Sequence, residues 1–352
     1  MSYDNSTSSS LLDDVTPTEG GCALSASDVT DTVKYSVYFF EGIIMFVGNL
    51  LLLAPIALHE GMRMKKEYIL VGALALADCL NGLGYVFAGY DRINSIRLCR
   101  HLTLVSRWEC AMVPSNFIWF FVEVTTGTMM AIISTDRLIL VLFPTWYLSQ
   151  GVTYAYCMSG IAYMHSIIVG IIGLYRVYEI KDIQSLYKPR MCFYSFSCED
   201  KHNAYHVSMI SYGALASVLI YILVLILYKK RSSKMTSRVS EAQAKRQRQM
   251  TVSMGISSTF TLFLFVIPIQ MDVVITHYTN LPKSLVVFCY IMANSNCIMN
   301  LFIFLIRHAE VRKGLAAVFK WQKLPVDMTQ WVERTRTVAP AKSGPAKSGN
   351  WT

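Results

Sequence analysis

Residues 204–228 read AYHVSMISYGALASVLIYILVLILY and contain no aspartate, glutamate, lysine or arginine. About 20 consecutive apolar residues are enough for an α-helix to cross the hydrocarbon core of a bilayer. A helix also lets a single segment satisfy its own backbone hydrogen bonds where no water is present. The stretch is therefore predicted to be a transmembrane helix.

Six other stretches share this length and apolar character. The seven predicted spans are 35–58, 68–90, 111–135, 152–175, 204–228, 250–276 and 284–306. Only 16% of the 352 residues are charged, whereas about a quarter are charged in an ordinary soluble domain. The predicted fold class is an all-α membrane protein, a seven-transmembrane helix bundle with a short amphipathic helix after the seventh span.

The segments around the spans complete the predicted organisation. Residues 1–32 are polar and acidic and are predicted to form a disordered extracellular tail. The membrane domain covers 33–306. Residues 307–320 combine apolar and basic side chains at helical spacing, so an amphipathic helix is expected along the inner leaflet. Residues 321–352 repeat Ala-Lys-Ser-Gly and are predicted to be a flexible cytoplasmic tail.

Lysine and arginine are distributed unequally between the two sets of loops. With the amino terminus outside, the inner segments hold 21 of them and the outer segments hold 11. Cytoplasmic loops carry the excess, so the amino terminus is predicted outside and the carboxyl terminus inside. The net charge of +9 then belongs to a membrane face and does not indicate a nucleic-acid partner. Asn5-Ser6-Thr7 is a predicted glycosylation site on the outer tail.

Five of the nine cysteines lie in predicted outer segments, where the environment is oxidising. They allow two disulfides and one leftover thiol, and Cys22 with Cys99 is one candidate pair. The five are Cys22, Cys99, Cys110, Cys192 and Cys198.

Polar side chains inside membrane helices are costly and usually serve a purpose. Each one either makes an interhelical hydrogen bond, which contributes about 1 kcal/mol, or contacts a ligand or ion. Those in the predicted spans include Glu41, Asn49, Asp78, Glu123, Asp272, Asn294, Asn296 and Asn300.

Four short motifs occur in register on successive spans. They are Gly48-Asn49, Leu74-Ala-Leu-Ala-Asp78, Asp136-Arg137-Leu138 with Pro144 and Tyr147, and Asn296-Cys-Ile-Met-Asn300-Leu-Phe-Ile-Phe304. Together they resemble the rhodopsin-like (class A) G protein-coupled receptors. Within that class, Asp78-Cys-Leu-Asn-Gly-Leu-Gly84 and Arg307-His-Ala-Glu-Val-Arg-Lys313 look most like nematode serpentine chemoreceptors of the Srsx type.

The resemblance implies a chemosensory receptor in the plasma membrane that detects a small external molecule and signals through a heterotrimeric G protein. Two alternatives are a neuropeptide-type receptor of the same fold and, from a different class, a seven-helix channel or transporter. The chain lacks symmetric broken helices and extensive intramembrane charge, which a transporter would favour. It also has neither His-Glu-x-x-His nor Gly-x-Ser-x-Gly, so no enzyme is predicted.

By this resemblance, Arg137 is held by Asp136 at rest and is released toward the G protein when helices move. The alternative for Arg137 is an ordinary boundary arginine whose charged end reaches water. Pro268 lacks a backbone donor and should kink the sixth helix. The residues implied in switching and coupling are Asp136, Arg137, Pro144, Tyr147, Tyr221, Pro268, Asn300 and Phe304.

Several positions depart from the family pattern. Val266 stands where an aromatic switch residue is usual, and Leu301 and Phe304 stand where proline and tyrosine are preferred. Gly213 replaces a proline in the fifth helix, and the fourth helix has no tryptophan. These departures leave the fold intact but put the conventional activation switch in doubt.

The resemblance also implies a polar cluster at mid-bundle, where many members bind a sodium ion. Sodium prefers oxygen ligands, and the alternative is a protonated Asp78 bonded to Asn300. No other cofactor is expected. The implied cluster is Asn49, Asp78, Thr126, Asn296 and Asn300.

A disulfide between the third helix and the second outer loop is a further implication, joining Cys110 to Cys192 or to Cys198. The ligand crevice of the family lies in the outer half, between the third, fifth, sixth and seventh helices. Glu123 could receive a cation or a donor there, or could simply stabilise the bundle. The implied ligand-binding residues are Trp119, Phe120, Glu123, Met209, Tyr212, Gln270, Asp272, Tyr290 and Asn294.

Overall fold

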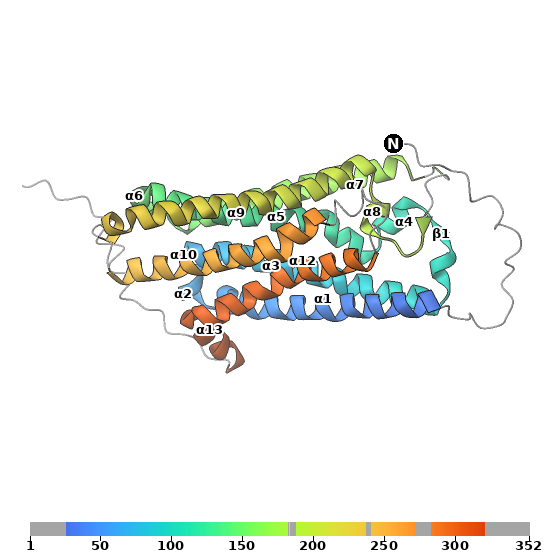
Figure 1. The fold of residues 1–352 in the computed structure, drawn as a ribbon, viewed down its shortest axis with the longest axis horizontal. Coiled ribbons are helices and arrows are strands. Elements are labelled where there is room, and N and C mark those ends of the chain that lie inside the picture. The colour runs from blue at the N-terminus through green and yellow to red at the C-terminus, as the bar shows by residue number, and fades with distance from the viewer. Residues whose placement is uncertain (1–25, 182, 184–187, 237–240, 272–282, 321–352) are drawn as a thin grey trace, which may run out of the picture.

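The computed structural model describes residues 26–181, 183, 188–236, 241–271 and 283–320. Seven of the described helices are long and apolar enough to cross a membrane, and they lie along a common direction (Figure 1). The crossing segments belong to α1 (Ala26–Leu58), α3 (Lys66–Arg97), α5 (Pro114–Leu142), α7 (Val152–Glu179), α9 (Asp200–Thr236), α10 (Glu241–Thr261) with its continuation, and α12 (Lys283–Arg307). The predicted fold class is confirmed.

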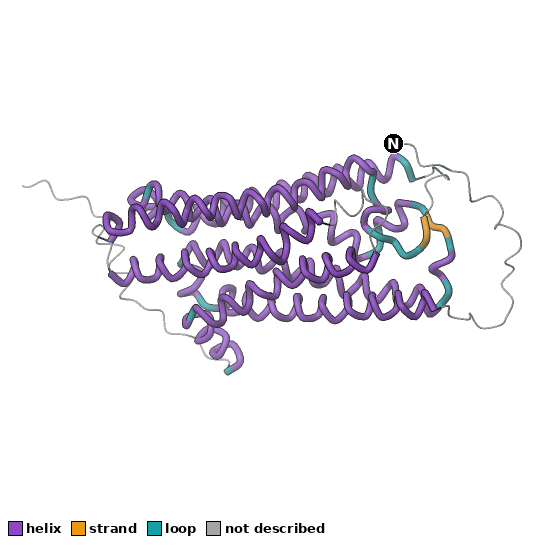
Figure 2. The backbone as a smooth tube through the Cα atoms, in the orientation of Figure 1, coloured by secondary structure: helices purple, strands orange, loops and turns teal. Residues whose placement is uncertain are grey.

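Short elements connect these helices at the two ends of the bundle. One end carries η1 (Arg100–Leu102), β1 (Leu104–Val105), α4 (Arg107–Ala111), β2 (Lys188–Pro189) and α8 (Tyr194–Ser197). The other carries α2 (Glu60–Arg63), α6 (Pro144–Ser149) and α13 (Ala309–Phe319). The antiparallel pair β1–β2 is the only sheet among the described residues and lies at one end of the bundle (Figure 2).

Helix boundaries differ from the predicted ones. The length of an apolar stretch matches the thickness of the bilayer core, whereas the helices continue beyond that core. The prediction of a tail through residue 32 is wrong for its last part, since α1 begins at Ala26. Thr32 donates its hydroxyl to the Asp28 carbonyl 2.7 Å away within this first part of the helix. At the third span, Pro114 begins α5, because the first helical position needs no backbone donor.

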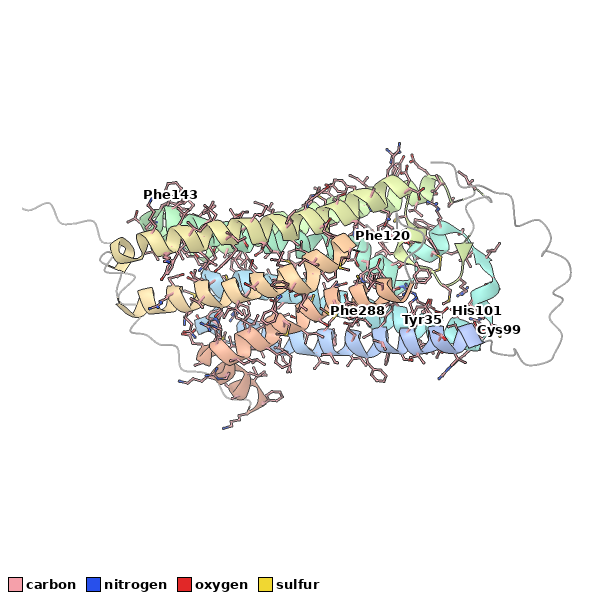
Figure 3. All side chains as sticks on the ribbon, in the orientation of Figure 1. Tyr35, Cys99, His101, Phe120, Phe143 and Phe288 are labelled. Carbon is pink, nitrogen blue, oxygen red and sulfur yellow. A yellow bond between two sulfur atoms is a disulfide. The ribbon has the colours of Figure 1, made fainter. Side chains whose placement is uncertain are left out.

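Large apolar side chains cover the outside of the bundle, as lipid contact requires. Phe40, Ile161 and Leu219 are each more than half exposed, and side chains project outward along the whole length of the helices (Figure 3). The same view places Phe143 at one end of the bundle and Cys99 and His101 at the other.

Glycine allows the closest approach between α5 and α9. A Cβ atom at Gly213 would lie 2.7 Å from the carbonyl oxygen of Gly127, which is too close for any side chain. Small residues permit such packing between membrane helices. Gly213, where the family pattern favours proline, therefore has a packing role in this chain.

The sixth spanning helix changes its geometry immediately before Pro268. Residues Leu262–Val266 form a π-helical turn, η3, which follows α10 and is continued by helix to Met271. A proline removes one backbone hydrogen bond, and a π-turn is a second way in which the regular hydrogen bonding of a helix is interrupted. The kink predicted at Pro268 stays a prediction, and the irregularity in the structure is this π-helical turn two residues before the proline.

Candidate functional site

We call the end of the bundle that carries α2, α6 and α13 the inner end and the opposite one the outer end. The inner end contains a buried ion pair. Arg137 and Asp136 near the end of α5 are both 0% exposed. The Nε of Arg137 donates to Asp136 Oδ2 at 2.9 Å, and Nη2 donates to the same oxygen. A buried guanidinium keeps its charge and therefore needs these acceptors. The structure thus contains the predicted contact between the two side chains, and Arg137 does not point to water.

Tyr147 completes this pair from α6. Pro144 begins that helix, and one turn later the Tyr147 hydroxyl accepts a 2.6 Å hydrogen bond from Arg137 Nη2. Lys66 of α3 donates to the Tyr147 carbonyl and lies 3.5 Å from the centre of its ring. Burial raises the pKa of Tyr147, so its hydroxyl stays protonated.

Gln247 of α10 connects the ion pair of α5 to Glu67 of α3. It accepts from Arg137 Nη1 at 3.0 Å and donates to Glu67 of α3. All three side chains are buried. The network therefore joins α3, α5 and α10 and closes the inner face between them. Sequence analysis missed Gln247, Glu67 and Lys66, because polar residues at helix ends look like loop residues until their helical register is known.

The remaining switch candidates occupy separate contacts. Tyr221 of α9 donates to the Thr251 carbonyl of α10 and has no hydrogen bond to Arg137 among the described residues. Phe304 stacks on His308 with ring centres 5.1 Å apart. Asn300 accepts from Ser257 of α10. The contacts of Tyr221 and Asn300 tie α10 to α9 and to α12.

Asp78 is buried at mid-bundle and is approached by the side chains of Thr126, Cys297 and Asn300. Asn296 lies nearby in α12 and accepts from Thr261 at 3.1 Å. Several buried polar atoms of this cluster lack a well-formed hydrogen bond to any described residue: both Asp78 oxygens, Asn49 Oδ1, Thr126 Oγ1 and Asn296 Nδ2. Buried polar groups normally have partners, so the cluster can accept an ion or water.

In the outer half, Glu123 of α5 faces His206 of α9, with 3.5 Å between Oε2 and Nδ1. The His206 ring packs against Tyr194, with centres 4.7 Å apart. His206 Nε2, His202 Nε2 and the Tyr194 hydroxyl are buried without a hydrogen-bond partner among the described residues. Sequence analysis missed these three residues, although His202 and His206 are four apart on one helix face.

Three of the predicted ligand residues donate hydrogen bonds to neighbouring helices, and a fourth is half-buried. Trp119 is buried and donates to Asn81 of α3 at 2.9 Å. Gln270 donates to Ser211 of α9. Asn294 donates to Glu41 at 3.2 Å. Met209 is half-buried on α9.

Three positions need correction. Tyr212 is 64% exposed on the lipid side of α9, because its register turns it away from the bundle. Phe120 packs instead against Tyr194 and His202, on the side of α7 and α8. Tyr290 is exposed at 44% and does not close a pocket wall. Asp272 and Asn5 lie outside the described residues, so their predicted roles stay predictions.

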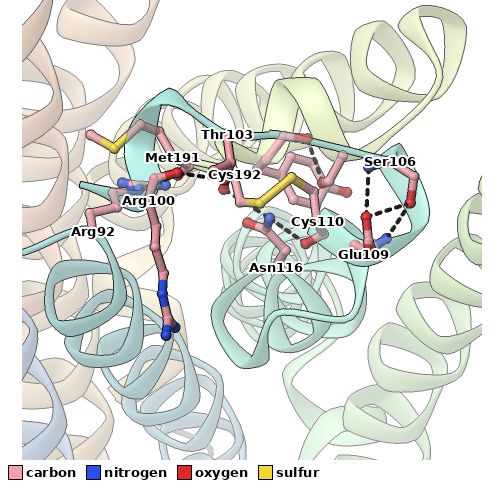
Figure 4. The surroundings of a disulfide bond; sticks show 11 residues. Arg92, Arg100, Thr103, Ser106, Glu109, Cys110, Asn116, Met191 and Cys192 are labelled. Atoms are coloured by element: carbon pink, nitrogen blue, oxygen red, sulfur yellow. Dashed lines mark hydrogen bonds between the residues drawn. A yellow bond between two sulfur atoms is a disulfide. The ribbon is translucent and has the colours of Figure 1, made fainter. Parts of the chain in front are cut away.

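A disulfide links α4, just before α5, to the segment before α8. Cys110 pairs with Cys192, and Asn116 donates to the carbonyls of both at 2.8 and 2.9 Å (Figure 4). Cys198, the other predicted candidate, is a free buried thiol. Cys99 is also disulfide-bonded; its predicted partner, Cys22, lies outside the described residues, so that pairing stays a prediction.

His308, between α12 and α13, supplies a pH-dependent contact. Its Nε2 lies 3.0 Å from Ser253 Oγ, and burial lowers the pKa of His308 to about 4. An unfolded histidine titrates near 6.5, so acidification protonates the unfolded chain first. The stabilisation is fully present above pH ~6.5 and is lost as the pH falls toward 4. Between pH 7.5 and 5.5 the loss should be about 1.4 kcal/mol.

This loss is measurable as a fall in Tm of the purified protein between the two pH values. His308→Gln keeps a donor for Ser253 but does not titrate, so its Tm should fall less than that of the wild type. An equal fall in both proteins would show that other groups cause it.

The family described as 7 transmembrane receptor (rhodopsin family) matches residues 48–304. The matched region begins at Gly48 and ends at Phe304, so it contains all four of the short motifs together with the inner ion pair. No curated protein matches the chain.

Proposed function

Because the chain belongs to the rhodopsin family of seven-transmembrane receptors, we propose that it is a chemosensory receptor that couples a small external molecule to a heterotrimeric G protein. In this proposal it resides in the plasma membrane with its amino terminus outside. The observation that carries the proposal is the buried network of Arg137, Asp136, Tyr147 and Gln247. Enclosing a charge at the inner end has a desolvation cost, so its presence there favours a functional role.

The network suits a closed resting state. Arg137 bridges α5 to α10 through Gln247, so an outward movement of α10 would break that hydrogen bond. The guanidinium would then be available to carbonyl and carboxylate groups of a cytoplasmic partner, with which it forms strong charge-assisted hydrogen bonds. A ligand that binds the open state better would shift the population toward it.

The proposed ligand contact is the outer-half cluster, which consists of Glu123, His202, His206 and Tyr194. Glu123 and His206 face each other across α5 and α9, and Trp119 lies one turn above Glu123. Buried groups with unused hydrogen-bonding capacity favour a small polar molecule with a donor and an acceptor. The described segments that connect the helices at this end are short, which favours a small molecule over a folded protein as the ligand.

Sodium binding at Asp78 is a separate proposal. The oxygens of Asp78, Thr126 and Asn49, which lack a well-formed hydrogen bond to any described residue, fit a hard cation, which would neutralise the buried carboxylate. Replacing an N-methylglucamine salt with sodium chloride at constant ionic strength should raise the Tm of the wild type and leave Asp78→Asn unchanged. Equal shifts in both proteins would contradict sodium binding at this site.

The function is tested by expressing the chain with sensors for each G-protein class and applying pools of small molecules. Charge-assisted hydrogen bonds contribute about 1.5–3 kcal/mol each, so Arg137→Ala should reduce signalling at least about tenfold at matched surface expression. The matched control is Arg176→Ala, because Arg176 is an exposed arginine that contacts Glu179 within α7.

Sensor responses that persist in Arg137→Ala would refute the coupling role. Ion current or solute uptake without any sensor response would replace the receptor proposal with the transport alternative.

A further inference from the structure

A groove with a volume of about 530 Å³ lies between the outer half of α1 and the middle of α12. Its apolar lining includes Val33, Val37 and Phe40 of α1 and Ile291 and Ile298 of α12. These α1 side chains are exposed on the side of the bundle, so the groove opens toward lipid. It is therefore reached from the bilayer, whereas Glu123 lies between α5 and α9.

Glu41 is the acidic residue among those that line this groove, and none of the lining side chains is basic. It is only 7% exposed. One of its oxygens accepts a 3.2 Å hydrogen bond from Asn294. A carboxylate has about four acceptor positions, so Asn294 leaves most of that capacity unused. A buried carboxylate with no cation nearby is costly in a membrane.

The other polar groups of the groove are also acceptors. Thr32, Ser36 and Ser295 each donate their hydroxyl hydrogen to a backbone carbonyl four residues earlier, at 2.7, 2.8 and 2.9 Å. Their oxygen lone pairs are what remains for another molecule. A ligand of this groove must therefore supply hydrogen-bond donors.

We propose that the groove binds a lipophilic amine from the outer leaflet, with its ammonium group on Glu41 and its hydrocarbon chain along the apolar lining. An ammonium supplies three donors and a positive charge, which complements a lining of acceptors and one carboxylate. The attraction is strong because the site is shielded from water. This site is additional to the proposed signalling function, and Asn294 connects it to the seventh helix.

The test compares three amphiphiles of one chain length: dodecylamine, dodecanol and dodecanoate. The purified protein is placed in lipid nanodiscs and its Tm is measured as each amphiphile is added. Dodecylamine should raise the Tm saturably, whereas dodecanol and dodecanoate should have little effect. Glu41→Gln keeps the shape and an acceptor for Asn294, and it should weaken the apparent affinity for dodecylamine at least about tenfold.

Two further variants keep the test decisive if Glu41→Gln folds poorly. Val37→Trp fills the groove from a lipid-exposed position and should also abolish the shift, while Glu123→Gln should retain it. Equal stabilisation by dodecanol would overturn the proposal in favour of a groove that takes any lipid chain. Loss of the shift in Glu123→Gln but not in Glu41→Gln would place the amine at Glu123 and would also overturn the proposal. Neither outcome depends on G-protein signalling.

Discussion

Asp136→Asn is expected to raise agonist-free signalling by about tenfold and to lower the Tm of the receptor. The variant leaves the Arg137 guanidinium buried without its charged partner. Removing one member of a buried ion pair costs about 3–5 kcal/mol. Part of that cost disappears when α10 moves outward and Arg137 reaches water or a partner. The closed state therefore loses more stability than the open state, and each 1.4 kcal/mol of difference changes the population tenfold.

G-protein sensors measure this effect at matched surface expression. Gln247→Leu should raise agonist-free signalling less, because it removes an uncharged partner of Arg137 and leaves the Asp136 carboxylate in place. Adding Arg137→Ala to Asp136→Asn should return the signal to background, since the released group is then absent. Agonist-free signalling at or below the wild-type level in Asp136→Asn would refute the closed-state role of the pair.

The fold could be predicted because a bilayer imposes one length on every crossing helix. Seven apolar stretches were sufficient to identify seven helices, and the short helix after them, α13, lies within the predicted 307–320. The ends could not be predicted, since they depend on local contacts outside the apolar region. The first helix illustrates this. Its polar residues from Ala26 onward are helical because side-chain hydrogen bonds and packing at the outer end stabilise the helix there.

The candidate site was only partly predictable. Asp136, Arg137 and Tyr147 were predicted because they occur together in a recognisable pattern. Gln247 has no such pattern, and its role depends on the distance between two helices that are far apart in sequence. On α9, a 3.6-residue period places His206 and Tyr221 inside and Tyr212 outside. Choosing aromatic residues by type without fixing that register led to the error at Tyr212.

The second large effect is expected at the outer disulfide. Cys110→Ser should reduce surface-expressed receptor by about tenfold or more, because the bridge closes a loop between residues 82 apart. In the chain-entropy treatment a loop of that size contributes about 4–5 kcal/mol. The bridge also fixes the two carbonyls that Asn116 binds. Surface labelling and ligand-independent thermal unfolding would measure the loss.

Cys192→Ser should be as harmful as Cys110→Ser, even though Cys198 lies only six residues away. The thiolate is the form that attacks another sulfur, and burial raises the pKa of Cys198 to about 12. Its Sγ also lies 3.3 Å from the Tyr194 carbonyl, inside the packing of α8. Cys198→Ser alone should therefore leave surface expression near the wild-type level. Should Cys192→Ser retain expression that the double variant Cys192→Ser, Cys198→Ser loses, Cys198 would be an alternative partner of Cys110, and the second outer loop would have two stable arrangements.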